Sequence, residues 1–114
     1  MEHVKRTFIE LSRVTGPLIA AGVSDDSLRA VQRQIMEGRG DVIKGANGLR
    51  KIRCAAAGRG KSGGVRIIFA DFPQQGKCFL LAAFAKNAQE NISSAERQDL
   101  AKLKAVLDRQ MTAR

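Results

Sequence analysis

The middle of the chain contains three consecutive stretches with the composition of β-strands, rich in branched and aromatic residues: 49–54, 65–70 and 77–85. A Gly-rich connection over Ala57–Gly64 (AGRGKSGG) and a turn over Asp71–Gly76 (DFPQQG) separate them. Strands joined by such short connections usually pair with their neighbours in sequence. We therefore expect an antiparallel meander at the centre of the fold.

A strand and two helices are predicted before the meander. A short strand over Val4–Glu10 opens the chain, and an internal Gly-Pro pair limits the next helix to a short one over Ser12–Ala21. Ser24 is a good N-cap for the second helix, because two acids follow it and apolar residues then recur at helical spacing. This helix is expected to end at Gly38, where a polar, Gly-rich link to the meander begins.

The C-terminal part predicts a long amphipathic helix. Ser93 and Glu96 match a capping box, and three leucines then repeat at helical spacing: Leu100, Leu103 and Leu107. The order β-α-α-β-β-β-α over residues 1–114 indicates a single α+β domain with a mainly antiparallel sheet.

Positive charge is concentrated in one part of the chain. The sequence has 20 Lys and Arg against 11 Asp and Glu, which gives a net charge of +9. No acid occurs between Asp41 and Asp71, and seven of the nine net charges lie there: Lys44, Arg50, Lys51, Arg53, Arg59, Lys61 and Arg66. Such a segment repels itself unless a polyanion neutralises it. The pattern favours a phosphate-bearing partner such as RNA over a solvated basic face.

The sequence disfavours a membrane or secreted protein. No apolar run approaches the roughly 18 to 20 residues of a membrane span, and the N-terminus lacks the apolar stretch of a secretion signal. Cys54 and Cys78 are too few for a disulfide framework and lack the spacing of a metal site. We expect a cytoplasmic protein with two reduced thiols in its core and no membrane partner.

Several kinds of catalysis are also disfavoured. His3 is the only histidine, so neither a paired-His acid and base nor a His-based zinc site can be built. Gly60-Lys61-Ser62 resembles the end of a phosphate-binding P-loop, but Ala55 stands where that motif requires Gly. We therefore expect no metal and no small-molecule cofactor.

The remaining candidate chemistry is cleavage of RNA by Lys and Arg. The 2′-OH of RNA can attack the neighbouring phosphate, provided that a protein aligns the nucleotide, moves the protons and stabilises the charged phosphorane. Arg suits charge stabilisation because it stays protonated. Lys51 lies between Arg50 and Arg53, where neighbouring cations favour a neutral amine that can act as a base. Electrostatic binding of RNA without catalysis stays open at this point.

Several short motifs follow one another along the chain: Gly48–Arg53 (GLRKIR), the loop GRGKSGG, Val65–Phe69 (VRIIF), Leu80-Leu81 and Phe84–Asn87 (FAKN). In order and spacing they resemble the RelE toxins of the RelE/ParE superfamily, and most closely the HigB-type branch. The resemblance implies a compact RelE-like domain with two N-terminal helices against a mainly antiparallel sheet. It also implies a toxin of a type II toxin–antitoxin pair that acts as a ribosome-dependent mRNA endonuclease and arrests translation. The implied partners are the ribosome, mRNA and a cognate helix-turn-helix antitoxin.

Carried over by position, the resemblance implies that four residues are catalytic: Lys51, Arg53, Arg66 and Lys86. Six others are then expected to contact RNA: Lys44, Arg50, Arg59, Lys61, Asn87 and Phe84. Many relatives have Tyr near the end of the last strand and in the third strand, whereas this chain has Phe84 and Phe69-Ala70 there. Because the chain has no Tyr and no Trp, base stacking falls to Phe or Arg.

Two other functions fit the same residues. The related ParE toxins share the fold and inhibit DNA gyrase without RNase chemistry. A non-catalytic RNA-binding or virulence-associated module would need only the positive charges, and the missing Tyr residues are consistent with it.

Overall fold

A five-stranded sheet with helices on both faces forms the fold, which a computed structural model describes for residues 5–56, 64–85 and 92–112. The elements follow the chain as β1 (Thr7–Glu10), α1 (Ser12–Ala20), α2 (Asp25–Met36), β2 (Asp41–Val42), β3 (Arg50–Cys54), β4 (Val65–Phe72), β5 (Lys77–Ala85) and α3 (Ser94–Thr112). The predicted α+β class and the order of its elements are confirmed. The structure adds β2, a two-residue strand within the segment predicted as a polar link.

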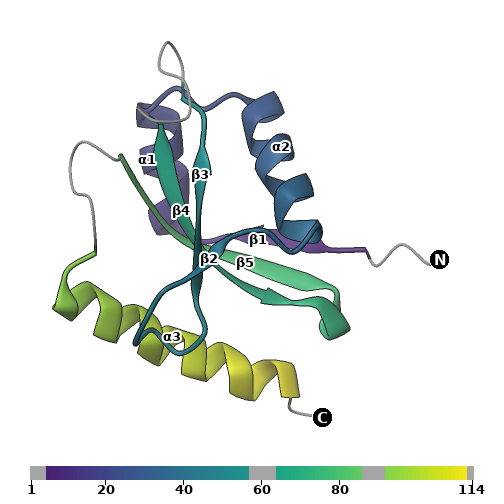
Figure 1. The fold of residues 1–114 in the computed structure, drawn as a ribbon, viewed down its shortest axis with the longest axis vertical. Helices are drawn as coiled ribbons and strands as arrows, with labels where there is room; N and C mark the ends of the chain where they lie inside the picture. Colours follow the sequence, from purple (N-terminus) through teal and green to yellow (C-terminus); the bar gives the residue numbers. More distant parts are fainter. Residues whose placement is uncertain (1–4, 57–63, 86–91, 113–114) are drawn as a thin grey trace.

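The sheet has the strand order β1-β5-β4-β3-β2. The predicted meander is present, since β3, β4 and β5 pair in succession and antiparallel. The first strand, β1, pairs parallel with β5, so that Thr7 lies opposite Lys77. The sheet is therefore mainly antiparallel with one parallel edge, and α1 and α2 lie on one side of it while α3 lies on the other (Figure 1).

The predicted helix caps are confirmed by hydrogen bonds. The Ser24 hydroxyl accepts a bond from the Ser27 amide at 3.1 Å. In the capping box, the Glu96 amide donates to the Ser93 hydroxyl and the Ser93 amide donates to the Glu96 carboxylate, each at 3.1 Å. These bonds determine where α2 and α3 begin. The start of α3 lies close to basic residues of the sheet.

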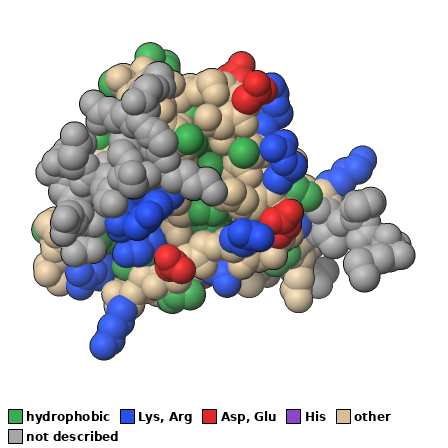
Figure 2. All heavy atoms as spheres, turned by 45° about the horizontal axis from the view of Figure 1, so that its top comes forward, with side chains coloured by type: hydrophobic (Ala, Val, Ile, Leu, Met, Phe, Trp, Pro, Cys, Tyr) green, Lys and Arg blue, Asp and Glu red, His purple; other side chains and the backbone are tan. Residues whose placement is uncertain are grey.

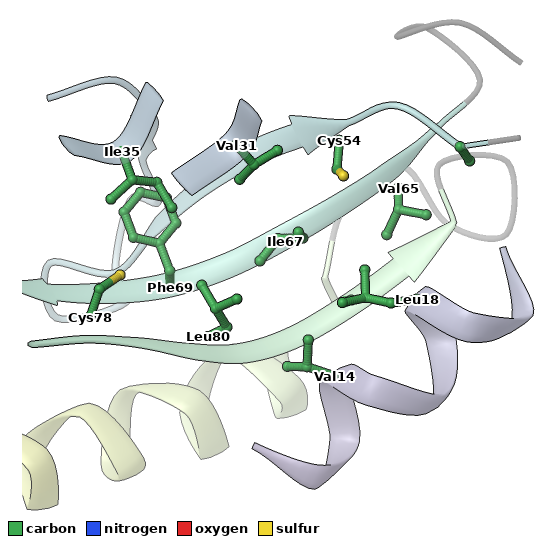
Figure 3. Close-up of a cluster of buried hydrophobic side chains, with 12 residues drawn as sticks. Val14, Leu18, Val31, Ile35, Cys54, Val65, Ile67, Phe69, Cys78 and Leu80 are labelled. Carbon is green, nitrogen blue, oxygen red and sulfur yellow. The ribbon is translucent and has the colours of Figure 1, made fainter. Parts of the chain in front are cut away.

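The closed face of the sheet, which α1 and α2 cover, carries a core of apolar side chains. Val14 and Leu18 of α1 and Val31 and Ile35 of α2 meet a row of buried sheet residues that includes Ile67, Phe69 and Leu80 (Figure 3). Phe69 is fully buried, and its ring occupies the space beside Gly40, where a Cβ atom would come within 2.8 Å of it. This face supplies the larger of the two cores.

Both cysteines lie in that larger core as free thiols, as predicted. Burial raises the pKa of the Cys54 thiol. Burial, reinforced by the negative charge of Asp71, raises the pKa of the Cys78 thiol to about 12. Both thiols are therefore protonated and unreactive at neutral pH.

The open face of the sheet, on the other side, is covered by α3 over only part of its area. Leu100 and Leu107 of α3 pack on a second apolar cluster with Leu49, Ile68 and Leu81. The loop between β2 and β3 lies against the same helix, since the Asn47 side-chain amide reaches the Ala101 carbonyl at 3.4 Å. No helix in the described part of the chain is long and apolar enough to cross a membrane.

Candidate nucleic-acid interface

The basic residues of β3 and β4 are sorted between the two faces by strand alternation. Cα pairing places Arg53 opposite Arg66, and Arg66 opposite Phe84. Lys51 is paired with Ile68, which belongs to the core under α3. Because paired residues point to the same face, Lys51, Arg53, Arg66 and Phe84 all lie on the open face.

This arrangement brings like charges together, and no ion pair found among the described residues balances them. Arg53 and Arg66 stand directly opposite each other, which is unfavourable for two cations on neighbouring strands. The ion pairs found among the described residues join other groups and involve none of Lys44, Lys51, Arg53 and Arg66. A bound anion would reduce this repulsion, so the charge distribution of the open face favours an anionic ligand.

Two adjoining hollows lie on the open face and share Lys51 and Arg66. The smaller, which we call the scissile hollow after the role proposed for it below, has a volume of about 210 Å³ and is lined by Asp41, Lys51, Ile52, Arg53 and Arg66. The larger, which we call the neighbour hollow, has a volume of about 360 Å³ and is lined by Val42, Ile43, Lys44, Lys51, Arg66, Ile68, Phe84, Ile92 and Arg97. Figure 2 shows several Lys and Arg side chains on one face of the molecule, with hydrophobic side chains and a few Asp and Glu side chains among them.

The neighbour hollow combines cations with apolar walls. Of the described residues that line it, four are cationic and none is acidic. Two of them carry an unusual feature: the Nε atoms of Arg66 and Arg97 are shielded from water, yet neither has a hydrogen-bond acceptor within the described residues. A shielded guanidinium donor without a partner costs free energy, and an anion bound between the two would supply the missing acceptors.

The scissile hollow contains a carboxylate. Asp41 of β2 is exposed and lies opposite Lys51 in the register of β2 and β3. Its presence next to three cations leaves the hollow positive. Hard cations such as Mg²⁺ need several oxygen ligands, and no three His, Cys, Asp or Glu residues gather anywhere in the described ranges. The donor set therefore suits an anion better than a metal ion.

The other residues expected from the sequence fall in three places. Lys44 and Phe84 line the neighbour hollow. Arg50 shares the closed face with Ile52 and Cys54, because it is paired with the core residue Phe69, so the structure does not bring it to the hollows. Four expected residues lie outside the described residues: Arg59, Lys61, Lys86 and Asn87.

Two charged residues that line the hollows were not predicted from the sequence. Asp41 marks the end of the acid-free segment, and only the pairing of the short β2 with β3 brings it opposite Lys51. Arg97 lies in the first part of α3, where the capping box signals a helix start but says nothing about which face meets the sheet. Asp41 carried no sequence signal for the site. The spacing of the leucines places Arg97, three residues before Leu100, on the sheet-facing side of α3, but it does not show which strands Arg97 meets.

The fold and the basic hollows can now be set beside known proteins. A family model described as the RelE toxin of the RelE/RelB toxin–antitoxin system matches residues 19–113. The match includes every described residue that lines the two hollows. Proteins of this kind are toxins, each paired with a cognate antitoxin that neutralises it. By this match over most of its length, the chain belongs to the RelE toxin family and is the toxin of a toxin–antitoxin pair.

Proposed function

We propose that this toxin is a ribosome-dependent mRNA endonuclease whose scissile phosphate binds in the hollow formed by Lys51, Arg53 and Arg66. The observation that carries the proposal is the convergence of these three cations from two paired strands onto one small concave surface. Their side chains have no acidic partner among the described residues, so they are available to a phosphate. A polyanion is the ligand that such a surface attracts most strongly.

Arg66 is the proposed stabiliser of the pentacoordinate phosphorane. It is partly shielded by β3, β5 and the apolar residues of the neighbour hollow, so its charge acts in a medium of lower dielectric than water. A fixed, permanently charged group in such a site stabilises developing negative charge without reorganising during the reaction. Loss of one such donor lowers kcat by about 10² to 10³ in well-studied enzymes.

The other cations have supporting roles. Lys51 is partly buried beside Arg66, and in the proposal it removes the proton of the attacking 2′-OH. Arg53 is exposed at the mouth of the hollow and holds a phosphate oxygen. Lys86, which follows β5 and lies outside the described residues, is the remaining catalytic candidate. The deprotonated 2′ oxygen then bonds to phosphorus as the P–O5′ bond breaks. The products are a 2′,3′-cyclic phosphate and a 5′-hydroxyl, whose oxygen takes its proton from solvent water.

Dependence on the ribosome fits the shape of the site. Both hollows are open to solvent, and Phe84 is the only aromatic residue among the described residues that line them. An open surface with little stacking capacity holds flexible RNA poorly in the in-line geometry that cleavage requires. We therefore infer that the ribosome presents the message, which places the protein's action in the cytoplasm. The resemblance to HigB-type toxins further implies that the cognate antitoxin is a helix-turn-helix protein.

The proposal is tested by Arg66→Ala, with Arg33→Ala as the matched control. Arg33 is exposed on α2, on the other side of the sheet. Induced wild-type toxin and Arg33→Ala should arrest growth and cut translated messages, whereas Arg66→Ala should lower mRNA cleavage at least about 10²-fold. Thermal unfolding of the purified variants shows whether each one is folded.

Three results would contradict the proposal. Full cleavage by a folded Arg66→Ala variant would remove the central residue. Equal cleavage of naked RNA would remove the ribosome from the mechanism. Growth arrest with DNA breaks and intact mRNA would favour the gyrase inhibitor, and RNA binding without any cleavage would favour the non-catalytic module.

A further inference from the structure

We infer that the neighbour hollow binds the nucleotide next to the scissile phosphate, and that Arg97 of α3 binds that nucleotide's other phosphate. The inference rests on the proposed function only in taking RNA as the polyanion. It assigns a binding role to a helix that follows all the strands of the sheet, and to a residue that lies 31 positions after Arg66.

The shape of the neighbour hollow suits one nucleotide. Its volume of about 360 Å³ is at the lower end of the ~300–1,000 Å³ range of small-molecule pockets. Ile43, Ile68 and Phe84 provide apolar walls, against which a base or a ribose can lie. Arg66 lines both hollows, so a strand that places one phosphate at Arg66 carries the adjoining nucleoside into the neighbour hollow.

Arg97 is held in position from two sides. The Ser93 carbonyl accepts a bond from the Arg97 amide at 2.9 Å, directly behind the capping box that starts α3. The aliphatic part of its side chain lies against Gly45 in the loop between β2 and β3, where a Cβ atom would be 3.8 Å from Arg97 Cδ. Gly45 has a φ of 75°, a conformation that favours glycine. The charged end of Arg97 is thus directed to the hollow by contacts that involve no charge.

The unpartnered donors identify the chemistry of the ligand. Arg97 Nε, like Arg66 Nε, is shielded and has no acceptor in the part of the chain that the structure describes. The Nε and Nη atoms of a guanidinium form a fork that matches two oxygens of a phosphate. Successive phosphates of RNA are separated by one nucleoside, so two such forks around an apolar pocket match the repeat of the RNA backbone.

The probe for this inference is adenosine 3′,5′-bisphosphate, which carries a phosphate on each side of one nucleoside. Its binding to the full-length chain is measured by calorimetry at several salt concentrations. Arg97→Gln should weaken binding by about tenfold to a hundredfold and lower the salt slope by about one. Arg109→Gln removes the same charge from an exposed position of the same helix and should change affinity less than about twofold.

A measurement on the unmodified chain keeps the test valid if Arg97→Gln fails to fold. The side-chain Nε–H resonances of Arg66 and Arg97 should both shift on addition of the bisphosphate. The resonance of Arg6, whose Nε donates to Asp71 at 2.9 Å, should stay in place. An unchanged Arg97 resonance, or unchanged affinity of a folded Arg97→Gln variant, would overturn the inference. Equally tight binding of inorganic phosphate would overturn the nucleoside part.

These outcomes are separate from those that test the proposed function. A chain that cuts mRNA but binds the bisphosphate without Arg97 would keep the nuclease proposal and lose this inference. A chain that binds the bisphosphate through Arg97 and never cuts mRNA would keep this inference and contradict the nuclease proposal.

Discussion

The two faces of the sheet use the same strands in opposite ways. On the closed face, β3, β4 and β5 present apolar side chains that α1 and α2 cover. On the open face, residues next to these in sequence are Lys51, Arg53 and Arg66, and α3 covers only the neighbouring apolar area. Because successive residues of a strand point to opposite faces, a residue of the apolar core and a residue of the basic surface can be neighbours in sequence. Substitutions one position apart should therefore have very different consequences.

The largest expected effect on stability comes from the closed face. Phe69→Ala should lower the free energy of unfolding by about 3 to 5 kcal/mol, because it removes a fully buried ring from the packed core. Arg66→Ala, three positions earlier and on the open face, should lower it by less than about 1 kcal/mol, because its shielded Nε has no partner within the described residues to lose. Urea denaturation of both variants measures the difference. Similar losses of unfolding free energy in the two variants would contradict the proposed difference between the closed and open faces.

A second effect concerns pH and again belongs to the closed face. The pKa of Cys78 is raised to about 12 in the folded chain, above that of an unfolded thiol. Its contribution to stability is therefore present in full below the unfolded pKa and is lost as pH rises toward the folded value. By pH 10 we expect a loss of about 1 to 2 kcal/mol relative to pH 7 from this thiol.

The variant Cys78→Ala isolates this contribution. It should be less stable than the wild type at neutral pH, since it opens a small cavity, but its stability should fall less steeply between pH 8 and pH 10. Denaturation curves at each pH provide the measurement. Parallel pH profiles for the two proteins would show that the pKa of Cys78 is the same in the folded and unfolded states.

The smallest expected effect concerns the carboxylate of the open face. Asp41 is exposed, so its repulsion of a phosphate in the scissile hollow is screened by water. Asp41→Asn should raise RNA affinity by about twofold and leave the cleavage rate within about threefold of the wild type. Ribosome-programmed cleavage with a defined message measures both. A loss of activity of a hundredfold or more would identify Asp41, rather than Lys51, as the proton acceptor.

Most of the fold could be predicted from the sequence because its signals are local. Ser24, Ser93 and Glu96 sit beside the helices that they cap, and the turn over Asp71–Gly76 separates two clear strands. The short β2 was missed because two residues in a Gly-rich segment have no alternation to detect. The parallel pairing of β1 with β5 was not predicted either, since it depends on residues about 70 positions apart.

Only the strand residues of the candidate site could be predicted from the sequence, because they follow from strand alternation. Alternation separates Lys51 and Arg53 from Arg50, and the structure keeps that separation. The spacing of Leu100 and Leu107 places Arg97, three residues before Leu100, on the side of α3 that faces the sheet. Which part of the sheet lies beneath that side is decided by tertiary packing, so the sequence could not place Arg97 beside Arg66.

The pairing of β1 with β5 has a consequence for how the toxin is made. Thr7 is synthesised 70 residues before its partner Lys77. Long-range pairing of this kind cannot form until both strands are available. The nascent chain therefore cannot join β1 to the rest of the sheet before β5, which pairs with both β1 and β4, has been made. The neighbour hollow forms later still, because Arg97 of α3 lines it.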